Sequence, residues 1–480
     1  MKYLKYPIYL FAASIGYFTA ACTVGPDYKK PEMAAPEAWT QQGAGVSTRP
    51  ADLAAWWAKF NDPQLTDLIE RAFANNLDLK IAESRIREAR ASRTIAGSAW
   101  YPQAGANASY QRQRLSENSF GAGGGTFPGI DRDIDSYSAT ADATWELDIF
   151  GKTRRAVEAA DATIDSAVES RRAIFVALLG DIARNYIELR GSQRQLSILN
   201  ERVRSQQQTI DLTKVRVETG LAAKLDLIRA EALFESTRAD IPPLESFVRE
   251  ASHRLSVLLG EFPGSLNSGL DTTKPIPIPP AEIPVGAPAD VLLQRPDLRR
   301  AEREVAAASA RIGAAVAEKY PKISLTTSIG PKATTLGDLF DHKSIFFSIG
   351  PNISIPLFQG GRLDANIEMQ TEREKQAVLQ FKQLLLIALE EVESGVSRFD
   401  REQSRRNALA ASVAAQERAV QMAKALYEQG LVDFLNVLEA ERVLLQAHDD
   451  LARSETLVSV HAVFIYKSLG GGWTEATFEE

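Results

Sequence analysis

Acidic side chains that alternate with apolar ones are the first residues in this sequence whose spacing suggests chemistry. Residues 137–149 follow a strict period of two, with apolar side chains on one side and polar or acidic ones on the other. Such alternation predicts a β-strand with two different faces. Paired carboxylates can act as general acid and base, but acids spread along one strand face fit the lining of a water-filled pore better. We therefore interpret three residues as candidates for a pore lumen: Asp142, Glu146 and Asp148.

The remaining candidates for catalysis or cofactor binding are weaker. A glycine-rich stretch at residues 121–125 lacks the following Lys-Ser/Thr of a phosphate-binding loop, so we interpret it as a surface loop. The net charge of −7 and the pI near 5.5 give no reason to expect nucleic acid as a partner. We expect no catalysis, no metal and no cofactor. Four histidines are scattered without the spacing of metal ligands: His253, His342, His448 and His461.

The N-terminus predicts export and a lipid anchor. Lys2 and Lys5 precede an apolar run over residues 7–21, which has the length of a signal-peptide core and is too short to span a bilayer comfortably. Small residues stand directly before Cys22, the only cysteine, as in the lipobox of bacterial lipoproteins, although Thr19 occupies the usual Leu position. We interpret residues 1–21 as a signal peptide and Cys22 as the lipidated first residue. An ordinary secretory signal followed by an incidental buried cysteine is the alternative.

Internal duplication organises the rest of the chain. Residues 219–231 resemble residues 427–442 in part, with Gly220 and Gly430 standing 210 positions apart. Each glycine follows a long helical pattern and predicts the left-handed residue that ends a helix. We predict two repeats, residues 63–262 and 291–470. A proline-rich linker, residues 263–290, joins them, an extended segment over residues 22–62 precedes them, and a tail over residues 471–480 follows.

Each repeat is predicted to contain one β-hairpin, at about residues 103–150 and about residues 322–357. Strands of roughly 9–11 residues are long enough to cross an outer membrane. Four strands cannot close a barrel, and an open sheet edge would leave backbone groups unsatisfied in lipid. Several copies must therefore share one barrel, and a conduit favours twelve strands from three chains over eight from two. A soluble antiparallel sheet is the alternative.

The predicted helices are unusually long. The helical pattern runs for about 68 residues from Lys152 and again from Arg362, or roughly 100 Å at 1.5 Å per residue. Many alanines and two apolar stripes suit a helix with a neighbour on each side, as in a curved wall of helices. A filament or coiled-coil rod would fit these helices, but it leaves the signal, the lipobox and the strands unexplained.

Five motifs together resemble the outer membrane factor family, in particular the OprM/NodT-type lipoproteins of RND efflux systems, which are related to TolC. The resemblance covers the whole chain. It implies a mainly α-helical homotrimer with a shared twelve-stranded β-barrel and a periplasmic α-barrel, anchored by lipid in the outer membrane. It also implies a periplasmic adaptor protein and an inner-membrane pump as partners. The motifs are CTVGPDYKKP at residues 22–31, RPD at 295–297, YP at 320–321, IPLFQGGR at 355–362 and YEQGLVDFLNVLEAER at 427–442.

The same resemblance places a periplasmic gate at the tip of the second helical hairpin. The constriction falls on Asp433, Asn436 and Glu439, with Tyr427 in the latch region before the turn. These three lie on one helix face, and in a trimer each position becomes a ring, so that the carboxylates favour cations. The alternative for Asp433 is a helix N-cap. The first repeat has Ala223 there, so the turn forms without an acid.

Two other functions remain open from the sequence. The chain could be the outlet of a type I protein-secretion system, or a periplasmic structural or adaptor lipoprotein that never spans the membrane. The long apolar strand face favours a duct over an adaptor, because an adaptor has no need of one. The lipobox and the VGPDY start favour efflux over protein secretion.

Overall fold

The computed structural model describes residues 23–32, 36–40, 45–47, 49, 52–114, 116 and 133–478. The predicted signal peptide, Cys22 and the glycine-rich loop at 121–125 lie outside these residues. The chain forms two compact units. Unit 1 comprises Met1–Pro31, Ile86–Ser166 and Ala301–Gln380, and unit 2 comprises Glu32–Arg85, Ala167–Arg300 and Phe381–Glu480. Both repeats contribute to both units, so the compact units do not coincide with the repeats in sequence.

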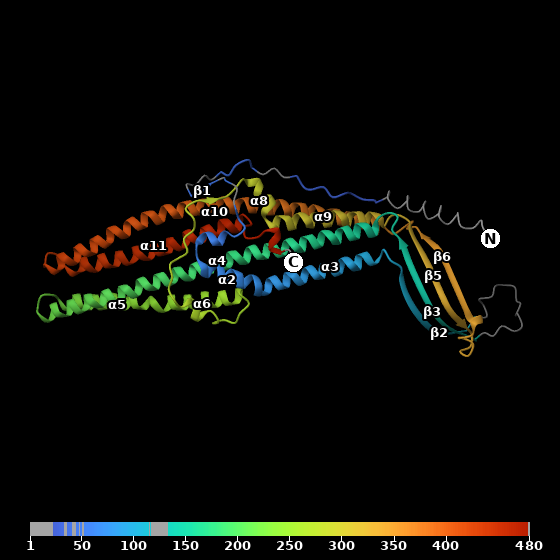
Figure 1. Ribbon diagram of the computed structural model, residues 1–480, viewed down its shortest axis with the longest axis horizontal. Coiled ribbons are helices and arrows are strands. Elements are labelled where there is room, and N and C mark those ends of the chain that lie inside the picture. Colours follow the sequence, from blue (N-terminus) through green and yellow to red (C-terminus); the bar gives the residue numbers. More distant parts are fainter. Residues whose placement is uncertain are drawn as a thin grey trace. The chain divides into compact units, whose positions relative to one another are not determined.

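Unit 1 contains a four-stranded antiparallel sheet in the order β2-β3-β5-β6 (Figure 1). The strands are β2 (Gln103–Arg114), β3 (Asp133–Leu147), β5 (Lys322–Ala333) and β6 (Ile345–Ser354), with the 3₁₀ turn η3 (His342–Ser344) before β6. Both predicted hairpins are confirmed, and the pairing of β3 with β5 joins the two repeats. The prediction placed the ends of two strands a few residues too far along the chain. β3 stops before Asp148, which caps the next helix, and β6 stops at Ser354, whose partner Lys322 is the first residue of β5.

The strand register gives the sheet one polar and one apolar face. Asp142 lies opposite Gly105 and Ser328, whereas Ala141 lies opposite Ala106 and Ile329. The outer edges of β2 and β6 have no strand partner within the described ranges. An apolar face and two open edges are what a strand group that shares a barrel with other chains requires. Large apolar side chains on this face are exposed: Ile329, Ile345, Phe347, Ile349 and Ile353.

The residues that follow Cys22 are held firmly on unit 1. Gly25 adopts a φ of 92° and crosses helix α9 (Pro296–Ala317) at Gly313, where a Cβ on Gly25 would come within 2.4 Å of the Gly313 Cα atom. Arg155 donates to the carboxylate of Asp27 at 2.6 Å. The Val24 amide donates to Phe150 O at 3.2 Å. The motif at residues 22–31 therefore fits its place through two glycines that allow close approach and one arginine that binds it.

Unit 2 holds the largest buried side chains. The Trp56 ring, in the 3₁₀ helix η1 (Trp56–Phe60), stacks on Tyr466 with ring centroids 5.2 Å apart. Asp62 begins α2 (Pro63–Asn75) by accepting hydrogen bonds from the amides of the second and third helical residues, which caps the helix. The smaller elements of this unit are β1 (Val46–Ser47), which pairs in parallel with β4 (Ile283–Pro284), α7 (Asn267–Leu270), α8 (Pro288–Gln294) and η4 (Glu475–Phe478). Helix α3 (Leu77–Ser98) begins in unit 2 and continues into unit 1.

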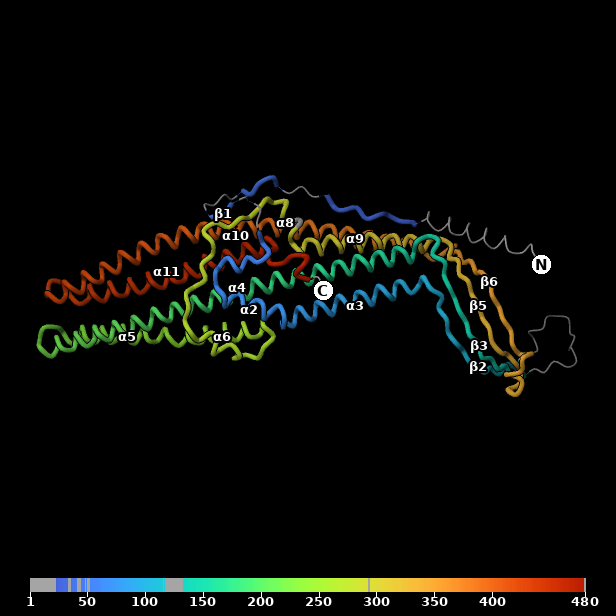
Figure 2. Tube along the Cα trace, viewed as in Figure 1, coloured from blue at the N-terminus to red at the C-terminus, as the bar shows by residue number. Residues whose placement is uncertain are grey.

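Two helical hairpins are the main features of the chain beyond the sheet (Figure 2). In the first, α4 (Lys152–Glu218) is followed by α5 (Lys224–Ala239) and α6 (Ile241–Leu258). In the second, α10 (Arg362–Glu428) is followed by α11 (Phe434–Ser468). The ends of both long helices agree with the prediction. The return helix is continuous only in the second repeat, because Pro242 and Pro243 interrupt it in the first. Within the described ranges, no helix combines the length and the apolar character that crossing a membrane requires.

Candidate channel gate

The second hairpin turns at Gly430, which has a φ of 73°. The Gly430 amide donates to Tyr427 O, and the Leu431 amide to Leu426 O, both at 2.9 Å. These bonds satisfy carbonyls at the end of α10, as in other helix ends with a left-handed glycine. No heavy atom lies within 4 Å of where a Cβ on Gly430 would stand. Glycine is therefore required here by backbone conformation and not by lack of space.

Asp433 occupies the N-cap position of α11, but its side chain makes no capping hydrogen bond. The Asp433 carboxylate is exposed instead. Asn436 bonds to the Asp433 carbonyl twice, from its backbone amide at 3.0 Å and from Nδ2 at 3.3 Å. The first turn of α11 is therefore closed by the asparagine and not by the acid. Capping does not explain why an aspartate stands at this position.

Glu439 is paired with Arg442, one helical turn further along α11. The arginine donates from Nη2 to Oε1 at 2.6 Å and from Nε to Oε2 at 3.0 Å. These two bonds hold the pKa of Glu439 below its usual value. The prediction from sequence missed Arg442, although a Glu followed three residues later by an Arg on a helix is a recognisable signal.

The predicted gate residues share one exposed face of α11. Asp433, Asn436 and Glu439 are exposed, whereas Phe434 and Val437 between them are buried. The structure therefore brings the three predicted residues together on one side of the helix. The opposite side supplies the packing that holds the helix in place.

Tyr427 lies apart from this exposed face, in an apolar cluster between the two hairpin ends. Its ring is 5.1 Å from the Phe434 ring, and the Arg216 guanidinium lies 4.7 Å from the Tyr427 ring centroid. Burial raises the pKa of Tyr427, and the charge of Arg216 opposes that rise. Because Arg216 belongs to the first hairpin, Tyr427 joins the two hairpins by a cation–π contact. The buried members of the cluster are Ile210, Ala230, Tyr427, Phe434 and Val437.

Two of the three predicted lumen acids lie on the polar face of the sheet. Asp142 accepts hydrogen bonds from Asn107 Nδ2 at 3.0 Å and Thr140 Oγ1 at 2.9 Å. Glu146 Oε1 is 3.8 Å from Lys152 Nζ. Their side chains are thus held by polar neighbours in the sheet and at the start of α4, as expected for a strand face that contacts water.

Asp148 has a different role from the one predicted. It follows the end of β3, and its carboxylate accepts from the amides of Thr153 at 3.1 Å and Arg154 at 2.8 Å, at the start of α4. A carboxylate at a helix N-terminus satisfies free amides and interacts favourably with the helix dipole. The alternation of polar and apolar residues continues past Leu147, where β3 ends. For this reason the sequence pattern wrongly placed Asp148 in the strand.

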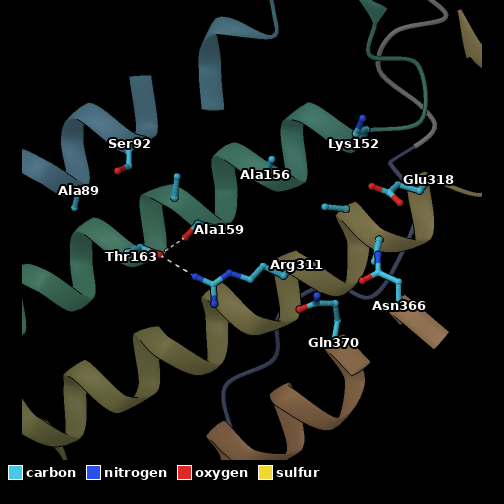
Figure 3. A pocket seen from close by; sticks show the side chains of 13 residues that line it. Ala89, Ser92, Lys152, Ala156, Ala159, Thr163, Arg311, Glu318, Asn366 and Gln370 are labelled. Carbon is cyan, nitrogen blue, oxygen red and sulfur yellow. Dashed lines mark hydrogen bonds between the residues drawn. The ribbon is translucent and has the colours of Figure 1, made fainter. Parts of the chain in front are cut away.

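Unit 1 also contains a cavity of about 510 Å³ between α3, α4, α9 and α10 (Figure 3). Arg311 reaches across it, with Nη2 3.4 Å from Thr163 Oγ1. Across the described part of the chain, no group of His, Cys, Asp and Glu side chains is arranged to hold a metal. The cavity is a depression in a wall of closely packed helices, which small side chains make possible. Those small side chains are Ala89, Ala156, Ala159, Ala160, Ala314 and Ala315.

The sequence matches the outer membrane efflux protein family over residues 68–261 and 287–471. Nodulation protein T of Rhizobium leguminosarum bv. viciae is 33% identical over 465 residues, which cover 97% of this chain and 93% of that protein. The cation efflux system protein CusC of Escherichia coli O6:H1 is 30% identical over 478 residues, covering 98% of this chain and 100% of that one.

A solved structure of the outer-membrane channel OprN is similar in fold, with a TM-score of 0.85 and 32% identity. The similarity covers 94% of this chain and 100% of that one. These matches confirm the resemblance and the predicted fold class, with long helical hairpins and strands that contribute to a β-barrel. The chain therefore belongs to the outer membrane efflux protein family, and it is an outer-membrane efflux channel rather than an enzyme.

Proposed function

We propose that three copies of this chain form one exit duct, anchored by lipid on Cys22, that crosses the outer membrane and extends into the periplasm. The sheet of unit 1 is the observation that carries this proposal. It has an exposed apolar face, a polar face and two edges without strand partners among the described residues. Three such sheets joined edge to edge make a barrel of twelve strands with an aqueous interior.

The partners in this proposal are a periplasmic adaptor protein and an inner-membrane pump of the RND type. Their cargo consists of small molecules, which the pump selects and the duct releases. One relative is described as a cation efflux system protein, which supports efflux of small cargo. In the duct, Asp142 and Glu146 line the barrel, and Asp433, Asn436 and Glu439 form three successive rings at the periplasmic end. Tyr427 holds the second hairpin in place behind those rings.

Single-channel conductance of the purified full chain in a planar bilayer tests the proposal. We expect small, cation-selective steps, because carboxylate rings attract cations. The steps should grow in the double variant Asp433→Ala/Glu439→Ala, whereas Glu231→Ala, which removes an exposed acid from the first hairpin, should leave them unchanged. A well-folded trimer that forms no channel would overturn the duct and favour a non-spanning lipoprotein. Steps that ignore both gate substitutions would keep the duct and reject this gate.

Mass spectrometry of the mature N-terminal peptide tests the lipid anchor separately. We expect a diacylglyceryl group on Cys22 and its loss in Cys22→Ser. An unmodified cysteine in protein from the outer membrane would show that export uses an ordinary secretory signal. The positions of residues 23–31 on unit 1 support the anchor, since they hold the chain close to the start of α4 and to the sheet.

A further inference from the structure

A buried carboxylate lies two residues beyond the exposed face of α11, and the proposed gate does not account for it. Glu441 is only 3% exposed. Its Oε1 atom is 2.7 Å from Lys424 Nζ on α10, and Thr209 Oγ1 on α4 donates to it at 3.5 Å. Its Oε2 atom is buried and has no hydrogen-bond partner among the described residues. Glu441 thus links three helices from both hairpins through one incompletely satisfied carboxylate.

Helix α4 presents a hydroxyl and a positive charge to Glu441. Thr209 supplies the hydroxyl, whereas Gln206, one turn earlier, donates instead to Thr237 on α5. Burial lowers the pKa of Arg202 on the same helix, and the charge of Glu441 opposes that shift. Removing one partner of a buried ion pair leaves the other charge uncompensated, which is strongly destabilising. Glu441 is the buried member of this pair, whereas the Lys424 side chain is 34% exposed. The carboxylate therefore depends on Lys424 while α11 lies against α4.

The first repeat contains the same pair of residues without the same contact. Lys214 and Glu231 stand 210 positions before Lys424 and Glu441. Both are exposed, and no ion pair joins them in the described structure. In the second repeat Ala419 stands at the position equivalent to Thr209. Glu231 therefore has no hydroxyl partner equivalent to the one that Thr209 gives Glu441. The helical hairpin alone therefore does not require the pair. Its burial depends on the packing of the second hairpin against α4.

We infer that Glu441 is a positioning residue of the gate, which holds the start of α11 against α4 and so keeps Asp433, Asn436 and Glu439 in the closed arrangement. This inference rests on the proposed gate. When α11 moves away from α4, the Glu441 carboxylate becomes hydrated, and this solvation offsets only part of the lost contacts. When α11 returns, the carboxylate pairs again with Lys424 and Thr209. The contact thus has two discrete arrangements, as a switching element requires.

The fraction of time that single channels of the full chain stay open tests the inference. We expect Glu441→Gln, which keeps the shape and removes the charge, to raise the open fraction at least tenfold. Glu231→Gln, the matched change in the first repeat, should leave it unchanged. Lys424→Met should open the channel in the same direction, whereas Lys424→Arg, which keeps the ion pair, should behave as the unmodified chain. A role confined to fold stability would change the number of channels that form and not the fraction of time that each channel stays open.

An unchanged open fraction in Glu441→Gln overturns the inference. If Glu441→Gln forms no trimer, Lys424→Met decides in its place, and an unchanged open fraction there has the same meaning. The outcome is distinguishable from failure of the proposed function. If the unmodified chain forms channels whose steps respond to Asp433→Ala/Glu439→Ala but not to either Glu441→Gln or Lys424→Met, then the gate stands and only the role of Glu441 falls. If the unmodified chain forms no channel, both fall.

Discussion

The two hairpin ends have almost the same backbone and different surroundings. Gly220 and Gly430 have φ values of 74° and 73°. The Leu221 amide donates to Arg216 O at 2.7 Å, and the equivalent Leu431 amide to Leu426 O at 2.9 Å. The next helix starts four residues after the glycine in both repeats. Turn geometry therefore depends on the local sequence alone, and a gate requires more than this turn.

Side chains around the turn make the difference between the ends. The second end has the aromatic residues Tyr427 and Phe434 where the first has Val217 and Lys224. These residues are buried against the first hairpin. The first end lacks such residues and is followed by a return helix that two prolines interrupt. Duplication thus supplied one scaffold twice, and substitutions made one end dependent on contact with the other.

Removing the aromatic ring of Tyr427 should have the largest effect on this contact. Because the ring is buried between the hairpins, we expect Tyr427→Ala to reduce the free energy of local opening at the start of α11 by about 3 kcal/mol. Its counterpart Val217→Ala should reduce it by less than about 1 kcal/mol. Hydrogen exchange of the amides at residues 434–441 measures both. Equal losses would mean that the two ends do not differ in the way described.

Glycine substitutions test whether the turns are equivalent. Neither Gly220 nor Gly430 has an atom within 4 Å of a Cβ position, so an added methyl group meets only the strain of a positive φ. We expect Gly220→Ala and Gly430→Ala each to destabilise the local turn by about 1 kcal/mol. Hydrogen exchange at residues 219–223 and 429–433 gives the values. A markedly larger loss at Gly430 would show that packing strains the second turn.

Exchanging the residue at the N-cap position tests whether the acid matters for the pore or for the helix. Asp433→Ala should alter helix stability by less than about 0.5 kcal/mol, because no capping bond is lost. In contrast, Asp62→Ala should reduce stability by about 1 kcal/mol, since Asp62 caps α2. Ala223→Asp should leave cation selectivity unchanged while Asp433→Ala reduces it. Reversal potentials in a salt gradient provide the check, and the opposite pattern would place the constriction at the first hairpin.

The smallest expected effect concerns pH. Since Arg442 lowers the pKa of Glu439, the carboxylate stays ionised at pH values where an ordinary glutamate is partly protonated. The contribution of this ion pair to stability is present above pH 4.5, the usual pKa of a glutamate. It is lost as the pH falls through the lowered pKa of Glu439. Cation selectivity should therefore persist at pH 4.5 and decline below it. In Arg442→Ala the decline should begin at higher pH, by a small amount because the pair is exposed. If cation selectivity depends on pH in the same way in Arg442→Ala as in the unmodified chain, Glu439 does not determine selectivity.

Much of the fold was predictable because it follows from local patterns. Helical periodicity and the two glycines located α4 and α10 to within one residue at their ends, and strict alternation located the two hairpins of the sheet. Local patterns also misled at Asp148, where the alternation outlasts the strand. The interrupted return helix of the first repeat could have been predicted from Pro242 and Pro243, which are sufficient to break it.

The exposed face of the candidate gate was also predictable, since residues three apart on a helix share a side. Its buried side was not. Lys214 with Glu231 and Lys424 with Glu441 have the same types and spacing, yet only the second pair is joined, and only its carboxylate is buried. Turns, caps and periodicity are set by neighbours along the chain, so the residues themselves reveal them. Whether a carboxylate pairs, hydrates or is buried depends on which helix lies against it, and only the packing of the two hairpins supplies that neighbour.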